Sequence, residues 1–311
     1  MTQMNLDRHP ASRRAEGRRR GPAQPMRSAD PSPSALRLAV AYPGPPGTHT
    51  SSAAAALFPS ARLRPLSGFR AVADAVTAAD VASGVLPIES SIAGPVTETH
   101  DLLYERELSI VAETVLAIRH CLAAPAPAEL ADIRIVRSHP AALEQCRDLL
   151  ARLPQVSVIP AATTADAGRL VAQHADPTEA AIVGPAAVEL YDLTVLLDDI
   201  GDHAAYTRFV SIAAHTNLDV PYGSARTAFS FVTAHRPGAL HAAIAPFAHA
   251  GLDLQRLVSR PQPATPWKYR FDAVVVGHPL DPVLRHALRD VRAATRELHV
   301  VGVYEAHEEG K

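Results

Sequence analysis

The sequence predicts an α/β protein made of a layered α/β domain followed by a smaller ferredoxin-like domain. Two observations lead to this prediction. From residue 35 onward, short apolar runs alternate with segments of helical periodicity, which is typical of helices packed on a largely parallel sheet. After a polar break at 215–224, the remaining residues follow the order β-α-β-β-α-β. At 311 residues, the chain has room for about two domains, each with its own core.

The first domain is expected to alternate strands and helices in chain order. Its apolar runs predict strands at 35–42, 82–89, 132–138, 155–162 and 179–185. The stretch GPPGTHTSSAAAALF, after the first of these, predicts a turn leading into a helix. A further helix is predicted over 141–153, where apolar residues recur at spacings of three and four to form one face: Leu143, Cys146, Leu150 and Leu153.

The second domain is expected to start near residue 225. Its elements are strand RTAFSFVTA, helix GALHAAIAPFAHAG, strands around LDLQRLVSR and WKYRFDAVVV, helix DPVLRHALRDVRAA and strand ELHVVGVYE. The polar segment before it carries Pro221 and Gly223, which interrupt both helical and strand patterns. We therefore place the boundary between the domains there.

Residues 1–36 are predicted to form a disordered basic tail. They carry seven Arg against three acidic residues and almost no apolar residues that could form a core. The rest of the chain is acidic, since the whole has a net charge of −2. This balance argues against nucleic acid or an anionic membrane as a partner. The tail lacks the apolar region of a secretory signal, and no run is long enough to span a bilayer.

Composition and motifs indicate an enzyme or binding protein without a cofactor. Two cysteines, Cys121 and Cys146, are too few for a disulfide framework or a zinc site, which favours a reducing, cytoplasmic setting. The histidines lack metal-ligand spacing, so no metal is predicted. The GPPGT turn is not a nucleotide loop, because Pro45 and Pro46 donate no N–H and it has neither the Walker lysine nor a third glycine.

Three strand-to-helix junctions carry hydroxyl residues in the first helical turn. They hold Thr48, Thr50 and Ser51 after Gly47; Ser138 before His139 and Pro140; and Thr163 and Thr164 before Asp166. Each fits an ordinary N-cap, and Asp166 is placed to complete a capping box. Helix N-termini also favour anions, so three of them facing one cleft would indicate a small ligand with more than one negative charge. Ser138 and His139 are adjacent, which argues against a hydrolytic triad.

The stretch LPIESSIAGPVTETHDLL, residues 86–103, places polar side chains at the end of an apolar strand. Glu89, Ser90 and Ser91 come directly after that strand, and Gly94 and Pro95 turn the chain into a helix. The carboxyl ends of strands are where α/β folds place their sites. Glu89 is therefore either a site carboxylate or a surface or hinge residue beside a capped helix.

The stretch HAAYTRFVSIA, residues 203–213, places Thr207 and Arg208 at the edge of an apolar run. Alone, this pattern indicates a strand end with a solvated guanidinium. Together with the three hydroxyl junctions, it also allows a strand that borders a binding cleft.

These stretches resemble the prephenate dehydratase family with a C-terminal ACT regulatory domain, over nearly all of residues 38–304. GPPGTHT is similar to the family's Gly-Pro-x-Gly-Thr-x-Ser, and LPIESSIAGPVTETHDLL to its Pro-Ile-Glu-Asn-Ser…Gly-x-Val…Asp-Leu-Leu block. Later blocks are matched in order by IRHCL (118–122), SHPAALEQC (138–146) and YTRF (206–209). PGAL (237–240) and SRP (259–261) resemble the two effector-binding motifs of the ACT domain.

The resemblance implies a two-lobed catalytic domain like a type II periplasmic binding protein, followed by a ferredoxin-like ACT domain. The catalytic domain would span 37–218, with one lobe from 37–113 plus 195–218 and the other from 114–194, and the ACT domain 225–308. The implied reaction is prephenate → phenylpyruvate + CO2 + water, in phenylalanine biosynthesis and without a cofactor. A homodimer or homotetramer with phenylalanine as allosteric effector is also implied.

The resemblance also assigns site residues. The catalytic set is Thr207, Arg208 and Glu89. Thr207 would donate a proton or hydrogen bond to the leaving hydroxyl, while Arg208 would act there, orient the strand or bind a carboxylate. The substrate-binding set is Thr48, Thr50, Ser90, Ser91, Ser138, His139, Thr163, Thr164 and Phe209. The effector set is Gly238, Ala239, Leu240, Ser259, Arg260 and Pro261.

Four positions depart from the family's pattern. Ser90, Ala141 and Ala205 stand where the family has Asn, Gln and Asn, so three amide hydrogen-bonding groups are missing from the expected site. Val258 stands where the effector motif has Glu, which bears on phenylalanine binding. Two alternatives therefore stay open: a divergent relative that decarboxylates without aromatising the ring, and a non-catalytic phenylalanine-sensing protein. The choice between prephenate and arogenate as substrate also stays open.

Overall fold

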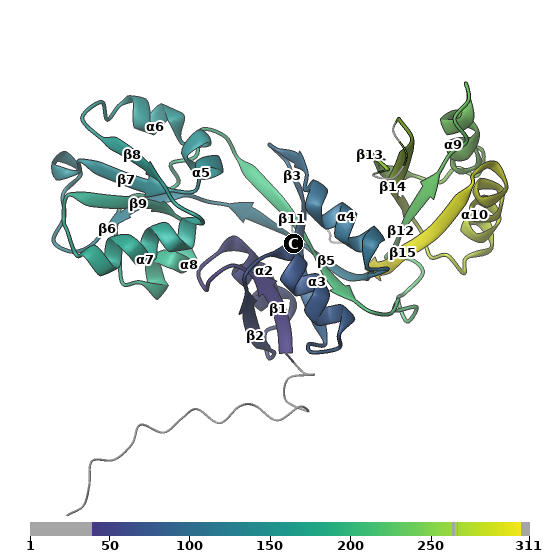
Figure 1. The fold of residues 1–311 in the computed structure, drawn as a ribbon, viewed down its shortest axis with the longest axis horizontal. Coiled ribbons are helices and arrows are strands. Elements are labelled where there is room, and N and C mark those ends of the chain that lie inside the picture. Colours follow the sequence, from purple (N-terminus) through teal and green to yellow (C-terminus); the bar gives the residue numbers. More distant parts are fainter. Residues whose placement is uncertain (1–38, 263–264, 266, 306–311) are drawn as a thin grey trace, which may run out of the picture. The chain divides into compact units, whose positions relative to one another are not determined.

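The computed structural model describes residues 39–262, 265 and 267–305, and they form two β-sheets with helices packed on them (Figure 1). The predicted tail, 1–36, lies outside the described residues. So do residues 37–38, the predicted start of the first domain, and 306–308, the predicted end of the second. The α/β class and the βαββαβ order of the C-terminal part are both confirmed.

Within the residues that the structure describes, the larger sheet has ten strands in the order β13-β14-β12-β15-β5-β11-β3-β1-β2, with β4 paired to β3. Its N-terminal strands are β1 (Ala39–Pro43), β2 (Arg62–Leu66), β3 (Ser83–Ser90), β4 (Gly94–Pro95), β5 (Ser109–Ile118) and β11 (Ala205–Ala213). The helices of this part are α2 (His49–Leu57), α3 (Phe69–Thr77) and α4 (Thr97–Glu105).

The expectation of a largely parallel sheet is wrong, because both sheets are mixed. Strands β2, β1 and β3 run parallel, whereas β11 runs antiparallel to both β3 and β5. The reason lies in the connections: the chain leaves the larger sheet along β5 and returns to it along β11. The outgoing and returning strands lie side by side and must therefore run in opposite directions.

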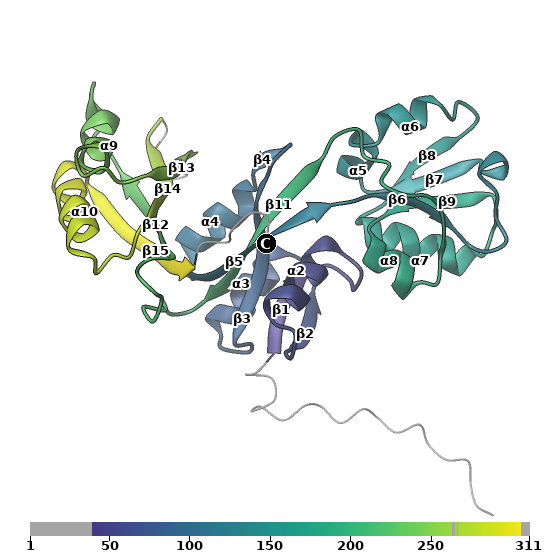
Figure 2. The ribbon, with the colours of Figure 1, turned by 180° about the vertical axis from the view of Figure 1, so that it is seen from behind.

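The smaller sheet has the strand order β10-β6-β9-β7-β8. Its strands are β6 (Cys121–Ala124), β7 (Ile135–Ser138), β8 (Ser157–Pro160), β9 (Glu179–Val183) and β10 (Thr194–Leu197). A short 3-10 turn, η1 (Leu130–Asp132), precedes β7. Helices α5 (Pro140–Glu144) and α6 (Arg147–Ala151) cover one face, and α7 (Thr164–His174) and α8 (Pro185–Leu190) cover the other (Figures 1 and 2).

The helix predicted over 141–153 is broken in two, which corrects that prediction. Its apolar face is present, since Cys146 is fully buried in the core beneath α5 and α6. The break comes from Asp202, far along the chain. Its carboxylate accepts from the backbone N–H groups of Arg147 (2.9 Å) and Asp148 (3.1 Å), and its own N–H donates to the Gln145 carbonyl (2.7 Å). These bonds begin a new helix at Arg147.

The C-terminal part consists of β12 (Ala225–Val232), α9 (Ala239–His249), β13 (Leu254–Pro261), β14 (Tyr269–Val276), α10 (Pro282–Ala294) and β15 (Glu297–Glu305). Both helices pack on one face of its four strands, over a core that includes Phe229, Phe231 and Phe247. The opposite face belongs to a different core, in which Ala228, Val274 and Tyr304 pack with residues of β1, β3 and α4. The N-terminal and C-terminal parts of the larger sheet therefore share one hydrophobic core.

Within the described residues, none of the helices has the length and apolar character needed to cross a bilayer.

Candidate functional site

Thr207 lies near the start of β11, in the part of the larger sheet where β3 ends. It pairs with Ser90 of β3 and with Leu116 of β5. Its side chain is half-buried, and its hydroxyl has no hydrogen-bond partner among the residues that the structure describes. A half-buried hydroxyl in this state is available to a ligand.

Strand alternation places Thr207 and Arg208 on opposite faces of the sheet. Thr207 shares its face with Phe209, which packs with Ala53 and Ala54 of α2. Arg208 shares the other face with Val210 and Ile212, which belong to the core shared with the C-terminal part. Thr207 and Arg208, although adjacent in sequence, therefore face different parts of the protein.

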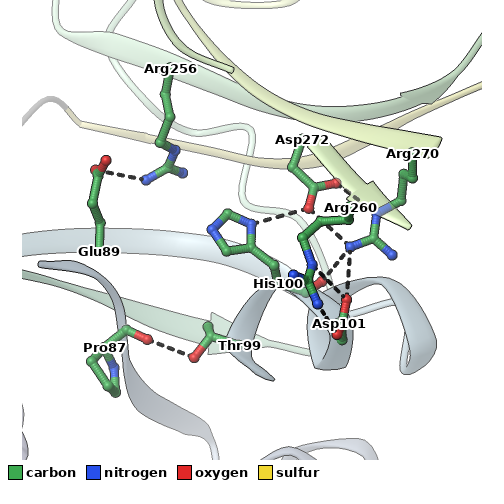
Figure 3. A network of polar contacts seen from close by, with 9 residues as sticks. All are labelled: Pro87, Glu89, Thr99, His100, Asp101, Arg256, Arg260, Arg270 and Asp272. Carbon is green, nitrogen blue, oxygen red and sulfur yellow. Dashed lines mark hydrogen bonds and ion pairs between the residues drawn. The ribbon is translucent and has the colours of Figure 1, made fainter. Parts of the chain in front are cut away.

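Arg208 lies in a cluster of charged side chains on its own face. Its Nη1 donates to Oε1 of Glu113 (2.5 Å), and its Nε lies 3.4 Å from Oε2 of Glu89. Arg226 also donates to Glu113 (2.8 Å). Arg256 lies 3.6 Å from Glu89, and Figure 3 shows the Arg256 guanidinium directed at this carboxylate. Burial disfavours the charge on Arg208, but the two carboxylates outweigh it and raise the pKa of its guanidinium. Glu89 and Arg208 are thus held together, away from the Thr207 face.

The turn after β3 is tied to β11 by its serines. The Ser90 hydroxyl accepts from the N–H groups of Ile92 (3.3 Å) and Ala93 (3.2 Å), which caps the turn. The Ser91 hydroxyl accepts from the N–H of Tyr206 (2.9 Å), and the Ser91 N–H donates to the Tyr206 carbonyl (2.9 Å). Both hydroxyls therefore hold the backbone beside Thr207.

The first turn of α2 leaves one of its hydroxyls uncommitted. Thr48 is the N-cap: its hydroxyl accepts from the Ser51 N–H and donates to the Pro45 carbonyl, both at 3.2 Å. The Ser51 hydroxyl donates to the Thr48 carbonyl (2.7 Å). Thr50 is half-buried, and its hydroxyl has no partner within the described part of the chain. Thr50 is thus the hydroxyl of this turn that is free to bind a ligand.

The first turn of α7 has the same arrangement. The Thr163 hydroxyl accepts from the Asp166 N–H and donates to the Asp166 carboxylate, both at 2.9 Å. The Asp166 carboxylate thus accepts from the hydroxyl of Thr163 and not from its backbone N–H, so the second bond of the expected capping box is replaced by a side-chain bond. Thr164 is half-buried and, among the described residues, has no side-chain hydrogen bond.

Two residues assigned to substrate binding lie inside the protein. Ser138 is fully buried, and its hydroxyl donates to the Ile182 carbonyl (2.6 Å) across the smaller sheet. Phe209 is 2% exposed, because its position in β11 directs the ring into the core under α2. Packing accounts for both side chains, so we correct their assignment as substrate-binding residues. His139 is exposed and caps α5 by accepting from the Ala141 N–H.

The three hydroxyl junctions lie near one another. A Cβ at Gly44, before the α2 turn, would stand 3.9 Å from the Thr163 methyl. The Ser138 carbonyl accepts from the Ala161 N–H (2.8 Å), which brings the end of β7 beside the start of α7. Two helix N-termini, those of α2 and α7, therefore open into the same region, where they favour an anion.

Two histidines in the matched motifs were not assigned a role from the sequence. The rings of His49 and His120 pack edge to face, 5.8 Å apart, and Nε2 of His49 lies 3.4 Å from the Arg119 carbonyl. Burial, together with the neighbouring His120, lowers the pKa of His49 to about 4. His49 is therefore neutral at physiological pH and joins α2 to the strand that leads into the smaller sheet.

We expect His49 to make the protein less stable in mild acid. Its pKa is about 6.5 when unfolded and about 4 when folded, so the unfolded chain takes up a proton first as the pH falls. Stability is then complete above pH 6.5 and declines between pH 6.5 and 4, by at most about 1.4 kcal/mol per pH unit. Urea unfolding at several pH values should show a flatter profile for His49→Gln. The same replacement at the exposed His215 should leave the slope unchanged, and an unchanged slope for His49→Gln would contradict the expectation.

Comparison with known proteins identifies the family. The family model described as prephenate dehydratase matches residues 40–217. The chain belongs to the prephenate dehydratase family. It is 35% identical over 271 residues to the bifunctional chorismate mutase/prephenate dehydratase of Pseudomonas aeruginosa, covering 86% of this chain and 73% of that protein. The match confirms the predicted family and its enzyme class, a lyase.

Two solved structures are similar along most of the chain. Prephenate dehydratase from Arthrobacter aurescens in complex with L-Phe is 30% identical, with a TM-score of 0.79 over 86% of this chain and 90% of that one. GqqA, described as a novel type of quorum-quenching acylase, is 29% identical, with a TM-score of 0.80 over 86% of this chain and 98% of that one.

In this prephenate dehydratase family member, the two predicted effector motifs lie at one end of the C-terminal strands. Gly238 precedes α9 with a φ of +78°, a conformation that favours glycine, and Ala239 and Leu240 border a pocket of about 480 Å³. Ser259 and Pro261 are exposed on β13. Their role as effector ligands stays a prediction.

Arg260, between them, binds the N-terminal part of the chain. It makes two bonds to the Asp101 carboxylate on α4, from Nη2 (2.5 Å) and Nε (3.2 Å). Arg270 also contacts Asp101, and Asp272 pairs with both Arg270 and His100 (Figure 3). Burial opposes ionisation of Asp272, but hydrogen bonds from His100 and Arg270 lower its pKa. Val258 lies on the same strand face as Arg260, so a Glu at that position would also face α4.

Among the described residues, no cluster of three or more His, Cys, Asp or Glu side chains is arranged to hold a metal ion.

Proposed function

We propose that this chain converts prephenate to phenylpyruvate, CO2 and water at the face of the larger sheet that carries Thr207. The observation that supports this most directly is the Thr207 hydroxyl: it is half-buried, it has no partner within the described residues, and it lies where β3 turns back onto β11. The ring substrate would lie against this strand end, with its C4 hydroxyl at Thr207.

The charges of prephenate fit the two helix N-termini. Its two carboxylates need N–H groups or cations, and α2 and α7 offer free backbone N–H groups close to each other. Thr50 and Thr164, whose hydroxyls are uncommitted, are the side chains we assign to substrate binding. Thr48, Thr163, Ser90 and Ser91 then act by fixing the turns around the substrate.

Little catalytic machinery is needed, because losing CO2 and water makes the ring aromatic. The enzyme has to hold the ring so that the carboxylate and hydroxyl leave together, and to hydrogen-bond the departing oxygen. Threonine is a poor acid, so Thr207 would act chiefly as a hydrogen-bond donor as that oxygen gains charge, and solvent would supply the proton that converts the departing hydroxide to water. The missing amides do not remove this group, since Ser90, Ala141 and Ala205 are neighbours of the site and not its donor.

We further propose that phenylalanine binds the C-terminal domain, that the chain works in the cytoplasm, and that it assembles into a homodimer or homotetramer. The first proposal is supported by the L-Phe complex of the similar Arthrobacter aurescens protein and by the pocket beside Ala239 and Leu240. Arg260, held by Asp101, would then lie at the border between the effector region and α4.

The geometry favours dehydration over acyl-group hydrolysis, the activity for which the similar acylase GqqA is named. Hydrolysis by a serine, threonine or cysteine needs a base in contact with that nucleophile. Within the described part of the chain, no such side chain is hydrogen-bonded to a histidine: Ser138 donates to a buried carbonyl and Cys121 to Asp198. A dehydratase needs no activated nucleophile.

Product analysis tests the proposed function. Purified full-length protein incubated with prephenate should release phenylpyruvate over many turnovers, detected by its ultraviolet absorbance and mass. A decarboxylated but non-aromatic product would instead identify the divergent relative, and stabilisation by ligand without turnover would identify a sensor. Parallel assays with arogenate, and with added phenylalanine, would establish substrate choice and regulation.

A further inference from the structure

Glu113 is a buried carboxylate that contacts two different parts of the chain. It lies on β5, and its side chain is 1% exposed. It accepts hydrogen bonds from Nη1 of Arg208 on β11 (2.5 Å) and from Nη1 of Arg226 on β12 (2.8 Å). Burying a carboxylate is costly unless it is paired with cations in good geometry. Glu113 and the two guanidinium groups therefore hold one another in place.

One of those partners is next to Thr207. Glu113 pairs with Val210, two residues beyond Arg208, so the two charged side chains are diagonal neighbours on one face of the β5–β11 pair. The register between β11 and β3 shifts between Arg208 and Phe209. The hydrogen bonding between β11 and β3 is therefore irregular beside Thr207. The ion pair between Arg208 and Glu113 holds this segment in addition to those backbone hydrogen bonds.

The other partner comes from the C-terminal domain. Strand β12 is not a neighbour of β5, because β15 lies between them. Arg226 pairs with Tyr304 of β15 and extends past it to the carboxylate. Arg256 of β13 approaches the same cluster through Glu89, at 3.6 Å, where the carboxylate is more exposed.

We propose that Glu113 is a positioning residue for the dehydration: bound by Arg208 and Arg226, it fixes the strand segment that carries Thr207. The C-terminal domain thereby contributes a residue, Arg226, on which catalysis depends even without an effector. This inference rests on the proposed role of Thr207, since Glu113 supports the strand segment from the face opposite to that hydroxyl.

Steady-state kinetics of the full chain with prephenate test it. Glu113→Gln and Arg226→Met should each lower kcat by about 10- to 100-fold, with KM changed less than about twofold, because a misplaced donor affects the reacting step more than binding. The double variant should be no worse than the more affected single variant, since both changes release the same segment. Glu113→Asp should recover most of the rate.

The matched control is Glu179→Gln. Glu179 is also a buried carboxylate, bound by Arg137 and His174, but it lies in the smaller sheet. Its replacement should lower the unfolding midpoint without changing kcat. A kcat within twofold of wild type for folded Glu113→Gln would overturn the inference. It would also be overturned if Glu113→Gln and Glu179→Gln both lost activity in proportion to the fraction of each protein that is unfolded.

Two further readouts separate this inference from the proposed function. In a Thr207→Ala background, Glu113→Gln should cause no additional loss of rate; an undiminished loss would show that Glu113 acts elsewhere. Amide hydrogen exchange at 205–208 should be at least about tenfold faster in Glu113→Gln and Arg226→Met, but unchanged in Glu179→Gln. This second readout needs no substrate, so unchanged exchange refutes the positioning role whichever reaction the enzyme performs.

Discussion

Replacing Thr207 by alanine is expected to lower kcat for prephenate by about 10²- to 10⁴-fold, the usual contribution of a positioned proton or hydrogen-bond donor. The change removes the uncommitted hydroxyl of β11 and leaves the strand intact, because its backbone bonds to β3 and β5 remain. KM should change little, since the donor acts mainly on the oxygen that gains charge as it departs.

Three further substitutions make this result specific. Thr207→Ser keeps the hydroxyl and should retain most of the rate, whereas Thr207→Val keeps the shape without the hydroxyl and should behave like alanine. Tyr206, the preceding residue, is 49% exposed, so Tyr206→Phe should leave kcat unchanged. If Thr207→Ala turned over prephenate within threefold of the wild-type rate, Thr207 would not be the donor.

Several strands and the C-terminal fold could be predicted because their signals are local, whereas β2, β5, β6 and β10 were not predicted. The apolar runs at 82–89 and 179–185 became β3 and β9 almost residue for residue. Each is buried, so its composition alone reports its structure. The βαββαβ order was readable for the same reason, since polar turns separate its elements.

Features that depend on distant residues could not be predicted. The helix over 141–153 has an unbroken apolar face, and only Asp202, 55 residues beyond Arg147, interrupts it. Likewise, the antiparallel direction of β11 follows from the return of the chain from the smaller sheet. Neither the helix break nor the strand direction can be read from the residues of the segment itself.

The candidate site divides in the same way. Its hydroxyl junctions are local motifs, and the structure places them near one another. The surroundings of Arg208 are not local: its partner Glu113 lies 95 residues earlier, and Arg226 contacts that carboxylate from the C-terminal part of the chain. Glu113 stands in SIVAETVLAI, an apolar segment that was not predicted as a strand and that the structure shows to be β5, and an acidic residue inside this apolar run was the one available signal.

The link between the two parts of the larger sheet explains the second large effect we expect. Strand β15 meets β5 at Gly302 and Ile110, which pair in parallel. A Cβ at Gly302 would stand 2.2 Å from the Ile110 carbonyl oxygen and 2.7 Å from its nitrogen. Backbone atoms cannot rotate away as a side chain does, so even alanine must force the strands apart.

Gly302→Ala should therefore lower the free energy of unfolding by about 3 kcal/mol or more, at the upper end of the cost of overpacking. Urea unfolding would measure this loss, with Gly223→Ala as the control, because nothing lies within 4 Å of a Cβ at Gly223. Separating β15 from β5 also moves Tyr304 and its neighbour Arg226 away from Glu113, so kcat should fall in the fraction that remains folded. A Gly302→Ala protein as stable as the control would mean that the two strands do not approach this closely, and the basis for Arg226 contacting Glu113 would be lost with it.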